Sequence, residues 1–332
     1  MSDTPARFVA LDVHKAYVVI GAVDGTQTVV LPPRRIALAQ FWEWVGHHLL
    51  PGDQVVLETT INAWTFYDQL VPLVSRVVVA NPAHIKLIAA SMVKTDKRDT
   101  LVLAKLLAAN LIPAVWVPPP EVRELRALVT HRQRLLKQRT MAKNRLQSLL
   151  HQHNLTPPGA DPFAVTHQTW WETLEHTLPP SERLRAQQDR AVVAYLTTLI
   201  HTVEEELARV SQQEPWRDQV PFLIQLPGIG LIGAMTVLAT IGDISRFASA
   251  KHLVGYAGLG ARIHASGQMH RSGSITRTGR AELRTMLVEA AWTTGNRRAY
   301  PPSAQMRFSR GHCPRRRSNT SLAPSRSCRL AG

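Results

Sequence analysis

The segment FVALDVHKAYVVIGAV, residues 8–23, decides the fold that we expect for the first part of the chain. Its apolar and β-branched residues favour strands, and Asp24-Gly25 directly behind it is a strong hairpin-turn signal. We therefore expect strands over residues 7–31. Two further apolar stretches, QVVLE at 54–58 and RVVVA at 76–80, predict short buried strands.

Segments with a helical spacing of apolar residues alternate with these strands. They cover residues 37–50, 64–74 and 85–109, and a charged string at 94–99 interrupts the last of them. Strands that alternate with helices predict an α/β domain with a central sheet. The opening hairpin makes that sheet mixed rather than purely parallel. Three prolines at 118–120 close the domain, so we expect it to span residues 1–118.

Two long helices are predicted beyond this domain, over residues 121–153 and 182–213, with an irregular stretch at 160–180 between them. Helices of this length can pair antiparallel, which predicts a helical arm over residues 119–220. Residues 121–145 hold eight basic and two acidic residues. Two interpretations stay open: a solvated coiled-coil arm, or an arm that also lies on nucleic acid.

A mainly helical C-terminal domain is expected over residues 221–300. It opens with LIQLPGIGLIGAMTVLATIG at 223–242, in which two apolar segments flank a Pro-Gly-Ile-Gly turn. This pattern is typical of a helix–hairpin–helix element, whose glycines let backbone N–H groups approach a phosphate. Gly228 and Gly230 are therefore candidate nucleic-acid contacts. The alternative is a tight turn between two helices that binds no ligand.

The charge of the chain indicates a polyanionic partner. Its 332 residues include 39 Lys and Arg against 24 Asp and Glu, a net charge of +15, and such an excess favours nucleic acid. Residues 301–332 contribute seven Arg and no acid, so the first 300 residues carry +8. We expect no signal peptide and no membrane span, since Pro and Gly break the longest apolar run, 223–241. A cytoplasmic protein is therefore expected.

Four carboxylates lie where a phosphoryl-transfer site would place them. Asp12 lies on one apolar strand, Glu58 ends the next, and Asp96 and Asp99 are three residues apart in KTDKRD. If a helix begins there, that spacing puts both on one face. Mg²⁺ sites for phosphoryl transfer need several carboxylates and leave room for phosphate oxygens. Taken singly, the last three also fit an ordinary charged surface, so the prediction rests on the set. The interleaved cations are candidate phosphate contacts: Lys94, Lys97 and Arg98.

A second candidate site lies in ARIHASGQMHRSGSITRTGRAELRTML, residues 261–287. Its glycines allow a sharply turning loop, and its serines and arginines can bind phosphate. Such a loop can also present a serine nucleophile, with Arg stabilising the charge of the transition state. The candidate phosphate contacts in this loop are Arg271, Arg277 and Arg284.

The elements LDVHK, VLETT, VANPAHIK and KTDKRDTLVLAKLLA, in this order and spacing, resemble the DEDD transposases of the bacterial insertion sequence 110 family. The resemblance covers roughly residues 7–300. It implies that the first domain has the ribonuclease-H-like fold of the Holliday junction resolvase RuvC. It also implies that Asp12, Glu58, Asp96 and Asp99 are the catalytic quartet and bind Mg²⁺.

The resemblance extends to the serine loop. Family members carry a Ser-Gly pair followed by a segment of the pattern I-[ST]-[KR]-x-G-x-x-x-L-R, which here runs from Ile275 to Arg284. This implies that Ser266, followed by Gly267, is the nucleophile, with Ser272 as the fallback. It further implies a DNA recombinase that forms a homo-oligomer, is guided by an element-encoded bridge RNA, and is associated with the nucleoid of a bacterium.

The chain departs from the family pattern near its C-terminus. Where further basic helices are expected, residues 301–332 are rich in Arg, Ser and Pro and have no apolar periodicity. We interpret this tail as disordered, and our hypothesis for its origin is a shift of the reading frame near residue 302. Two alternatives to an active transposase therefore stay open. One is a junction-resolving RuvC-like nuclease that uses only the four carboxylates, and the other is an inactive, truncated remnant that binds nucleic acid.

Overall fold

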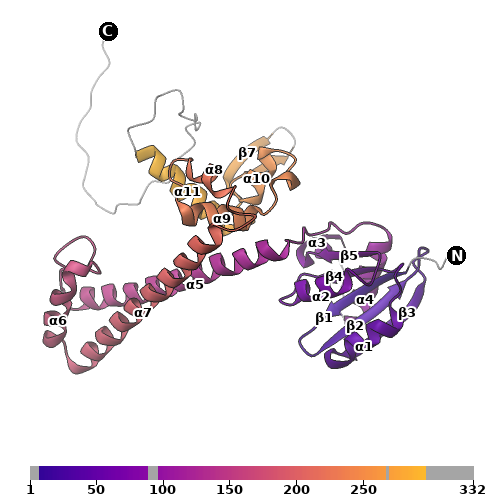
Figure 1. Cartoon of the computed structure of the whole chain (residues 1–332), viewed down its shortest axis with the longest axis horizontal. Coiled ribbons are helices and arrows are strands. Elements are labelled where there is room, and N and C mark those ends of the chain that lie inside the picture. Colours follow the sequence, from indigo (N-terminus) through magenta and orange to yellow (C-terminus); the bar gives the residue numbers. More distant parts are fainter. Residues whose placement is uncertain (1–6, 89–95, 267–268, 297–332) are drawn as a thin grey trace, which may run out of the picture. The chain divides into compact units, whose positions relative to one another are not determined.

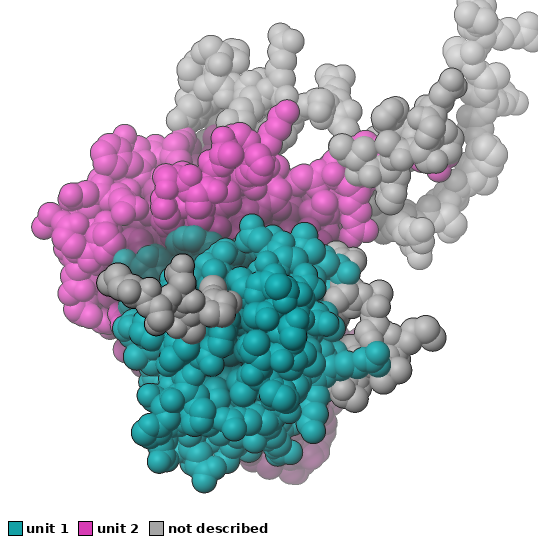
Figure 2. Space-filling view, turned by 90° about the vertical axis from the view of Figure 1, so that its right-hand side faces the viewer, with its two compact units in different colours: residues 1–123 teal, residues 124–332 magenta. Residues whose placement is uncertain are grey.

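The computed structural model describes residues 7–88, 96–266 and 269–296 (Figure 1). The chain forms two compact units, residues 1–123 and 124–332, which Figure 2 colours teal and magenta. Each unit has its own apolar core. The finer boundaries expected at 118, 220 and 300 stay predictions, and the Arg-rich tail lies outside the described residues.

A five-stranded mixed sheet forms the centre of the first unit. β1 (Phe8–Val13), β2 (Tyr17–Val23) and β3 (Val29–Ala37) form an antiparallel meander. β4 (Gln54–Glu58) pairs in parallel with the other edge of β1, and β5 (Arg76–Ala80) pairs in parallel with β4. The strand order is β3-β2-β1-β4-β5, which confirms the mixed α/β architecture and makes β1 the central strand.

Helices cover both faces of this sheet. α1 (Leu38–His48) and α2 (Ala63–Leu70) pack on one face, and α4 (Asp96–Ala108) packs on the other. Ala10 of β1 and Val56 of β4 are buried on the α4 face. Alternate residues of a strand point to the same face, so Asp12 and Glu58 belong to the α4 face as well.

Two described helices lie in and before the helical stretch expected over residues 85–109. α3 (Pro82–Ile88) begins at a proline, whose fixed φ suits the first turn of a helix. α4 is described from Asp96, and residues 89–95 lie outside the described part of the chain. The charged string therefore leads into the N-terminus of a helix, where two of its acidic residues form the first turn.

Two long helices, α5 (Pro120–Gln152) and α7 (Pro180–Ser211), lie side by side and run antiparallel (Figure 1). We call α5, α6 and α7 with their connections the arm. Two ion pairs, each with an N–O distance of 2.5 Å, fix the direction of the helices: Arg132–Glu204 and Arg145–Asp189. The antiparallel pair agrees with the sequence, whereas coiled-coil packing stays a prediction.

The stretch expected to be irregular, 160–180, contains a 3-10 turn, η1 (Val165–His167), and the helix α6 (Gln168–Thr177), so that prediction is wrong. Trp171 is buried against leucines of α5, and its Nε1 donates to the backbone oxygen of Pro162 over 2.8 Å. A helix of ten residues is marginal by itself. Burial of the Trp171 ring supplies the stabilisation that the local sequence lacks.

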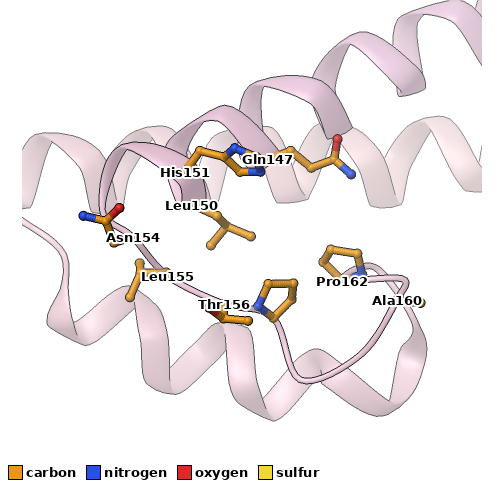
Figure 3. Close-up of a pocket in the computed structure, with 9 residues that line it drawn as sticks. Gln147, Leu150, His151, Asn154, Leu155, Thr156, Ala160 and Pro162 are labelled. Carbon is orange, nitrogen blue, oxygen red and sulfur yellow. The ribbon is translucent and has the colours of Figure 1, made fainter. Parts of the chain in front are cut away.

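A hollow of about 680 Å³ lies beside the end of α5 and the connection that follows it (Figure 3). Gln147, His151, Asn154 and Thr156 supply its polar groups, and leucines, prolines and an alanine supply its apolar ones. None of the residues that line it is a carboxylate. This hollow therefore differs from the predicted carboxylate site.

The end of the second unit is mainly helical, with one hairpin. Its elements are α8 (Val220–Ile224), α9 (Leu231–Ile241), η2 (Ile244–Arg246), α10 (Ala250–Tyr256), β6 (Ala261–Ser266), β7 (Met269–Ile275) and α11 (Ala281–Asn296). The predicted serine loop is therefore largely the β6–β7 hairpin. α8 and α9 flank the Pro-Gly-Ile-Gly turn, but α8 has only five residues, and the helix–hairpin–helix assignment stays a prediction. None of the described helices is both long and apolar enough to cross a membrane.

Candidate metal site and nucleic-acid contacts

Two of the predicted carboxylates lie on neighbouring strands. β1 and β4 pair in parallel up to Leu11 and Leu57, and Asp12 and Glu58 are the next residues of these strands. Both therefore lie at the same level of the sheet and on the same face. The Asp12 side chain is 28% exposed, and Glu58 is half-buried.

The other two carboxylates belong to the first turn of α4. Asp96 is the first residue of the helix and Asp99 follows three residues later. Negative side chains are favoured at this end, because its backbone N–H groups point outward without helical partners. The buried Thr100 donates its hydroxyl to the backbone oxygen of Asp96 over 2.7 Å. Leu103 anchors the helix on the sheet face that carries Asp12.

Asp12 and Asp96 converge on one histidine. His14 Nε2 lies 3.0 Å from Asp12 Oδ2 and 3.5 Å from Asp96 Oδ2. Tyr17 donates its hydroxyl to the same Asp96 oxygen over 3.3 Å. One ligand atom from each of Asp12, His14 and Asp96 lies within 4.8 Å of the others, so these three side chains can bind one metal ion.

His14 was missed by the sequence analysis. It directly follows β1 and lies two positions beyond Asp12. Residues two apart in an extended segment point to the same side. The signal was therefore present in LDVHK, as a histidine two residues after an aspartate near the end of a strand.

The carboxylates oppose one another's ionisation. Burial raises the pKa of Asp12 above its ordinary value, and its contact with His14 acts in the opposite direction. The charges of Asp96 and Asp99 raise the Asp12 pKa further, which shows that Asp99 is within electrostatic range of this group. A set of carboxylates that repel one another is one that a divalent cation stabilises.

The predicted cations near this site occupy the surface. Lys97 and Arg98 lie on the exposed first turn of α4, between Asp96 and Asp99. Lys94 lies outside the described residues. Contact between these cations and phosphate stays a prediction.

The two candidate serines take different places in the β6–β7 hairpin. Ser266 is the last residue of β6 and pairs with Met269, the first residue of β7. Ser272 lies within β7 opposite Ile263 and is exposed. Ser266 therefore lies at a strand end of the hairpin, and Ser272 lies inside a strand. The Ser266 side chain and Gly267 lie outside the described part of the structure.

The two glycines of the Pro-Gly-Ile-Gly turn differ in their surroundings. Gly228 has a φ of +81°, and a Cβ there would lie 2.6 Å from the backbone oxygen of Ala290 in α11. Gly230 is the N-cap of α9, and a Cβ there would meet no atom within 4 Å. The close packing against α11 therefore explains why residue 228 is a glycine. At Gly230 the space around the start of α9 would admit a side chain. A nucleic-acid contact stays a prediction for both.

The three predicted arginines of the serine loop also differ. Arg284 is partly buried, and its Nη1 donates to the backbone oxygen of Ala257 over 3.0 Å. Arg271 and Arg277 are exposed. Arg284 therefore holds α11 against the end of α10, and the other two are the more accessible candidates for phosphate binding.

Many of the cations of α5 bind partners within the same chain. Of the eight basic residues at 121–145, at least four bind a carboxylate or a backbone carbonyl: Arg123 (Asp68), Arg126 (Ala239 and Thr240), Arg132 (Glu204) and Arg145 (Asp189). These contacts favour a structural role for this part of the charge. The interpretation that the arm also lies on nucleic acid must rest on the remaining cations.

Two arginines bind the C-terminal end of α9. Arg126 donates to two of its last carbonyls, over 2.6 and 3.0 Å, and Arg246 donates to a third over 3.0 Å: Ala239, Thr240 and Ile241. Cations are favoured there, since the last carbonyls of a helix have no helical partner. Burial lowers the pKa of Arg126 to about 10. No local sequence pattern reveals this contact, because Arg126 and Ala239 are 113 positions apart.

Two family models match the chain. That of IS110-type DEDD transposases, described as Transposase, matches residues 9–155. That of the Transposase IS116/IS110/IS902 family matches residues 220–307. The first match includes all four predicted carboxylates, and the second includes both candidate serines.

Individual relatives agree with these matches. A pilin gene-inverting protein of Moraxella bovis is 30% identical over 257 residues, which are 75% of this chain and 70% of that protein. The transposase for insertion sequence element IS1111A of Coxiella burnetii is 26% identical over 292 residues, 86% of this chain and 77% of that one. The Sinorhizobium fredii protein y4qE is 29% identical over 225 residues, and the match covers 68% of this chain and 53%, about half, of that relative.

Proposed function

Because this chain belongs to the IS116/IS110/IS902 family of transposases, we propose that it cuts and rejoins DNA strands at the ends of an insertion sequence. The reaction uses Asp12, Glu58, Asp96 and Asp99 with Mg²⁺, and Ser266 as the nucleophile. The observation that carries the proposal is the convergence of Asp12 and Asp96 beside the start of α4.

The donor set fits a hard divalent cation. Asp12 and Asp96 offer carboxylate oxygens, the ligands that Mg²⁺ prefers. Glu58 ends the strand next to Asp12, and Asp99 shares a helical turn with Asp96. When bound, Mg²⁺ neutralises charge on the phosphate and makes a coordinated oxygen a better nucleophile or leaving group. Mounting on strand ends and on a packed helix keeps these carboxylates in place for that role.

Ser266 performs the covalent step of the proposal. Its Oγ attacks a backbone phosphorus, the bond from that phosphorus to a sugar oxygen breaks, and the serine proton passes to the departing sugar hydroxyl. A sugar hydroxyl of the second DNA then attacks the serine-linked phosphorus and returns a proton to Ser266. Each step exchanges one P–O bond for another, so no other energy source is needed. The place of Ser266 at the end of β6 supports its choice over Ser272, which lies within β7.

DNA is the proposed substrate, and an RNA encoded by the element is the proposed guide. The names of the Moraxella and Coxiella relatives state gene inversion and an insertion sequence, which supports DNA recombination here. We expect the guide to select the sites by base pairing, while exposed cations such as Lys97, Arg271 and Arg277 bind phosphates without reading sequence. The acting form is a homo-oligomer on the nucleoid in a bacterial cytoplasm.

A plasmid recombination assay tests this function. One plasmid carries the joined ends of the element, the second carries a target, and the non-coding RNA next to the gene is supplied. The unchanged chain should join the two, and Asp12→Asn and Ser266→Ala should each abolish the products. Ser272→Ala is the matched control. Loss of products in Ser272→Ala, with full activity in Ser266→Ala, would identify Ser272 as the nucleophile instead. No product from the unchanged chain would favour the inactive remnant.

A junction-resolving nuclease is the second candidate, because all four carboxylates lie in the first unit and both serines lie in the second. Such an enzyme needs only the carboxylates. Cleavage of a four-way DNA junction by Ser266→Ala, at the rate of the unchanged chain, would favour the nuclease. A recombinase with this substitution loses covalent attachment to DNA and strand transfer together.

A further inference from the structure

His14 lies inside the carboxylate cluster. Its Nε2 faces Asp12 Oδ2 at 3.0 Å and Asp96 Oδ2 at 3.5 Å, and 34% of its side chain is exposed. It follows the central strand directly, so its backbone is held by the sheet. His14 N also donates to the backbone oxygen of Tyr17 over 2.9 Å, which closes the turn between β1 and β2. A metal ion that reaches the two carboxylates therefore also reaches the imidazole.

The spacing of these atoms suits a shared metal ion. Two ligands at right angles, each about 2.1 Å from an ion, are about 3.0 Å apart, and two at a tetrahedral angle are about 3.4 Å apart. The distances from His14 Nε2 to the Asp12 and Asp96 oxygens, 3.0 and 3.5 Å, agree with these values. At these distances an ion can replace the proton between the His14 nitrogen and a carboxylate oxygen.

Neighbouring side chains hold the imidazole in its orientation. The His14 ring stacks on Tyr17, with 4.4 Å between centroids and 23° between planes. Tyr17 in turn donates to Asp96 Oδ2, and the guanidinium carbon of Arg35 lies 3.4 Å from the centre of the Tyr17 ring. Groups outside the ligand set that orient a metal-binding histidine raise its affinity for the metal. Tyr17 and Arg35 have the geometry of such supporting groups.

We propose that His14 is a nitrogen ligand of the divalent ion held by Asp12 and Asp96, and that it makes this site prefer Mn²⁺ and the later first-row divalent ions to Mg²⁺. The inference rests on the proposed function, which assigns a metal to these carboxylates. Imidazole nitrogen suits first-row transition metals, whereas Mg²⁺ favours oxygen ligands and gives up its waters reluctantly. A site with two carboxylates and one imidazole therefore discriminates against Mg²⁺ more than a site of carboxylates alone.

The competing assignment makes His14 a hydrogen-bond donor to Asp12 and no more. The metal would then be bound through oxygen only. Gln at this position offers an N–H donor at the place of His14 Nε2, but its amide nitrogen has no lone pair free for a metal. His14→Gln therefore separates the two roles, because it keeps a hydrogen-bond donor to Asp12 and removes the imidazole nitrogen.

Manganese binding to the full chain tests the inference. Free Mn²⁺ is followed by electron paramagnetic resonance during a titration, and Mg²⁺ is then added as competitor. Pulsed resonance of the bound ion reports coupling to the ¹⁴N nucleus of a coordinated imidazole. The variants are His14→Ala, His14→Gln and Asp12→Asn. His47→Ala, which removes an exposed histidine of α1, is the matched control. Circular dichroism verifies the fold of each.

We expect ¹⁴N coupling in the unchanged chain and in His47→Ala, and its loss in both His14 variants. The affinity for Mn²⁺ should fall about tenfold or more in the His14 variants. The affinity for Mg²⁺ should change less, so the preference for Mn²⁺ shrinks. Asp12→Asn should weaken the binding of both ions.

Bound Mn²⁺ without ¹⁴N coupling, or coupling that persists in His14→Ala, would overturn the inference and leave the carboxylate site of the proposed function intact. Failure of the unchanged chain to bind Mn²⁺ would overturn both. If the His14 variants do not fold, the comparison of the unchanged chain with a sample grown on ¹⁵N-histidine decides. Coupling that switches from ¹⁴N to ¹⁵N supports imidazole ligation, and its absence in both samples overturns it.

Discussion

A Cβ on Gly279 would lie 2.2 Å from the backbone oxygen of Tyr256. Gly279 has a φ of +103°, and the next residue, Arg280, donates its N–H to that same oxygen over 3.1 Å. Glycine is required here for two reasons, since the backbone is left-handed and the approach is too close for any side chain. This contact ties the start of α11 to the end of α10, on either side of the hairpin that carries the candidate serines.

Gly279→Ala should lower the free energy of unfolding by about 2 kcal/mol or more, from backbone strain and the displaced contact. It should also lower recombination, because the hairpin loses its fixed end. Gly273→Ala is the control, since a Cβ there lies 3.6 Å from its nearest neighbour, in ordinary contact. Denaturant unfolding of both variants measures the difference. Equal free energies of unfolding for the two variants would show that the Gly279 contact does not stabilise the fold.

Arg126→Ala should destabilise the second unit by about 2–3 kcal/mol. The substitution removes charge-assisted hydrogen bonds to the last carbonyls of α9 and leaves these carbonyls partly buried. Arg134→Ala, on an exposed position of the same helix, should change stability by less than about 0.5 kcal/mol. Hydrogen exchange at the C-terminal end of α9 should speed up in the first variant only. Unchanged exchange there would contradict the capping role.

Trp171→Ala should cost about 3–5 kcal/mol, because the ring is 3% exposed and its loss leaves a cavity between α5 and α6. Val165→Ala, at a residue that is 88% exposed in the same segment, should have almost no effect. Metal binding in the first unit should survive Trp171→Ala, since the two units have separate cores. If Trp171→Ala abolishes metal binding as well as the fold of the arm, the two units do not fold independently.

Asp12→Asn should make the metal-free protein more stable at pH 7, although it abolishes recombination. Burial raises the pKa of Asp12 in the folded chain, so the folded form holds this proton more tightly than the unfolded form. The contribution of Asp12 to stability is then fully present below the unfolded pKa and is lost as pH rises through the folded pKa. At pH 7 the ionised Asp12 costs stability, and the substitution removes that cost.

Thermal unfolding with a chelator at pH 7 and near pH 4 measures this effect. The advantage of Asp12→Asn should be present at pH 7 and shrink at the lower pH. Added Mg²⁺ should raise the midpoint of the unchanged chain more than that of the variant, since a ligand of the folded form stabilises it. A lower midpoint for Asp12→Asn at pH 7 without metal would contradict the assignment.

The sheet could be predicted from the sequence because its signals are local. The apolar stretches at 54–58 and 76–80 coincide with β4 and β5. The shared face of Asp12 and Glu58 follows only once the parallel register of β1 and β4 is known. The partners of Asp12 were harder to foresee. His14 is close in the sequence, but its role depends on α4 bringing Asp96 to the end of β1.

Contacts between distant segments account for the predictions that failed. α6 forms where Trp171 meets leucines of α5, and no periodicity within its own ten residues shows that partner. The segments that flank the β6–β7 hairpin meet where Gly279 approaches the backbone oxygen of Tyr256. In the sequence Arg126 resembles the other cations of its helix, and only the packing of α9 reveals its role. In each case burial against a remote element, rather than local propensity, decides the structure.

The internal partners of the arm change what its charge means for binding in solution. A protein that binds DNA gains affinity by displacing condensed counterions, about one for each phosphate that a cation neutralises. Arg123, Arg132 and Arg145 already neutralise carboxylates of their own chain. They have little charge left to exchange for sodium or potassium. The dependence of affinity on salt concentration will therefore be shallower than the count of 39 Lys and Arg implies.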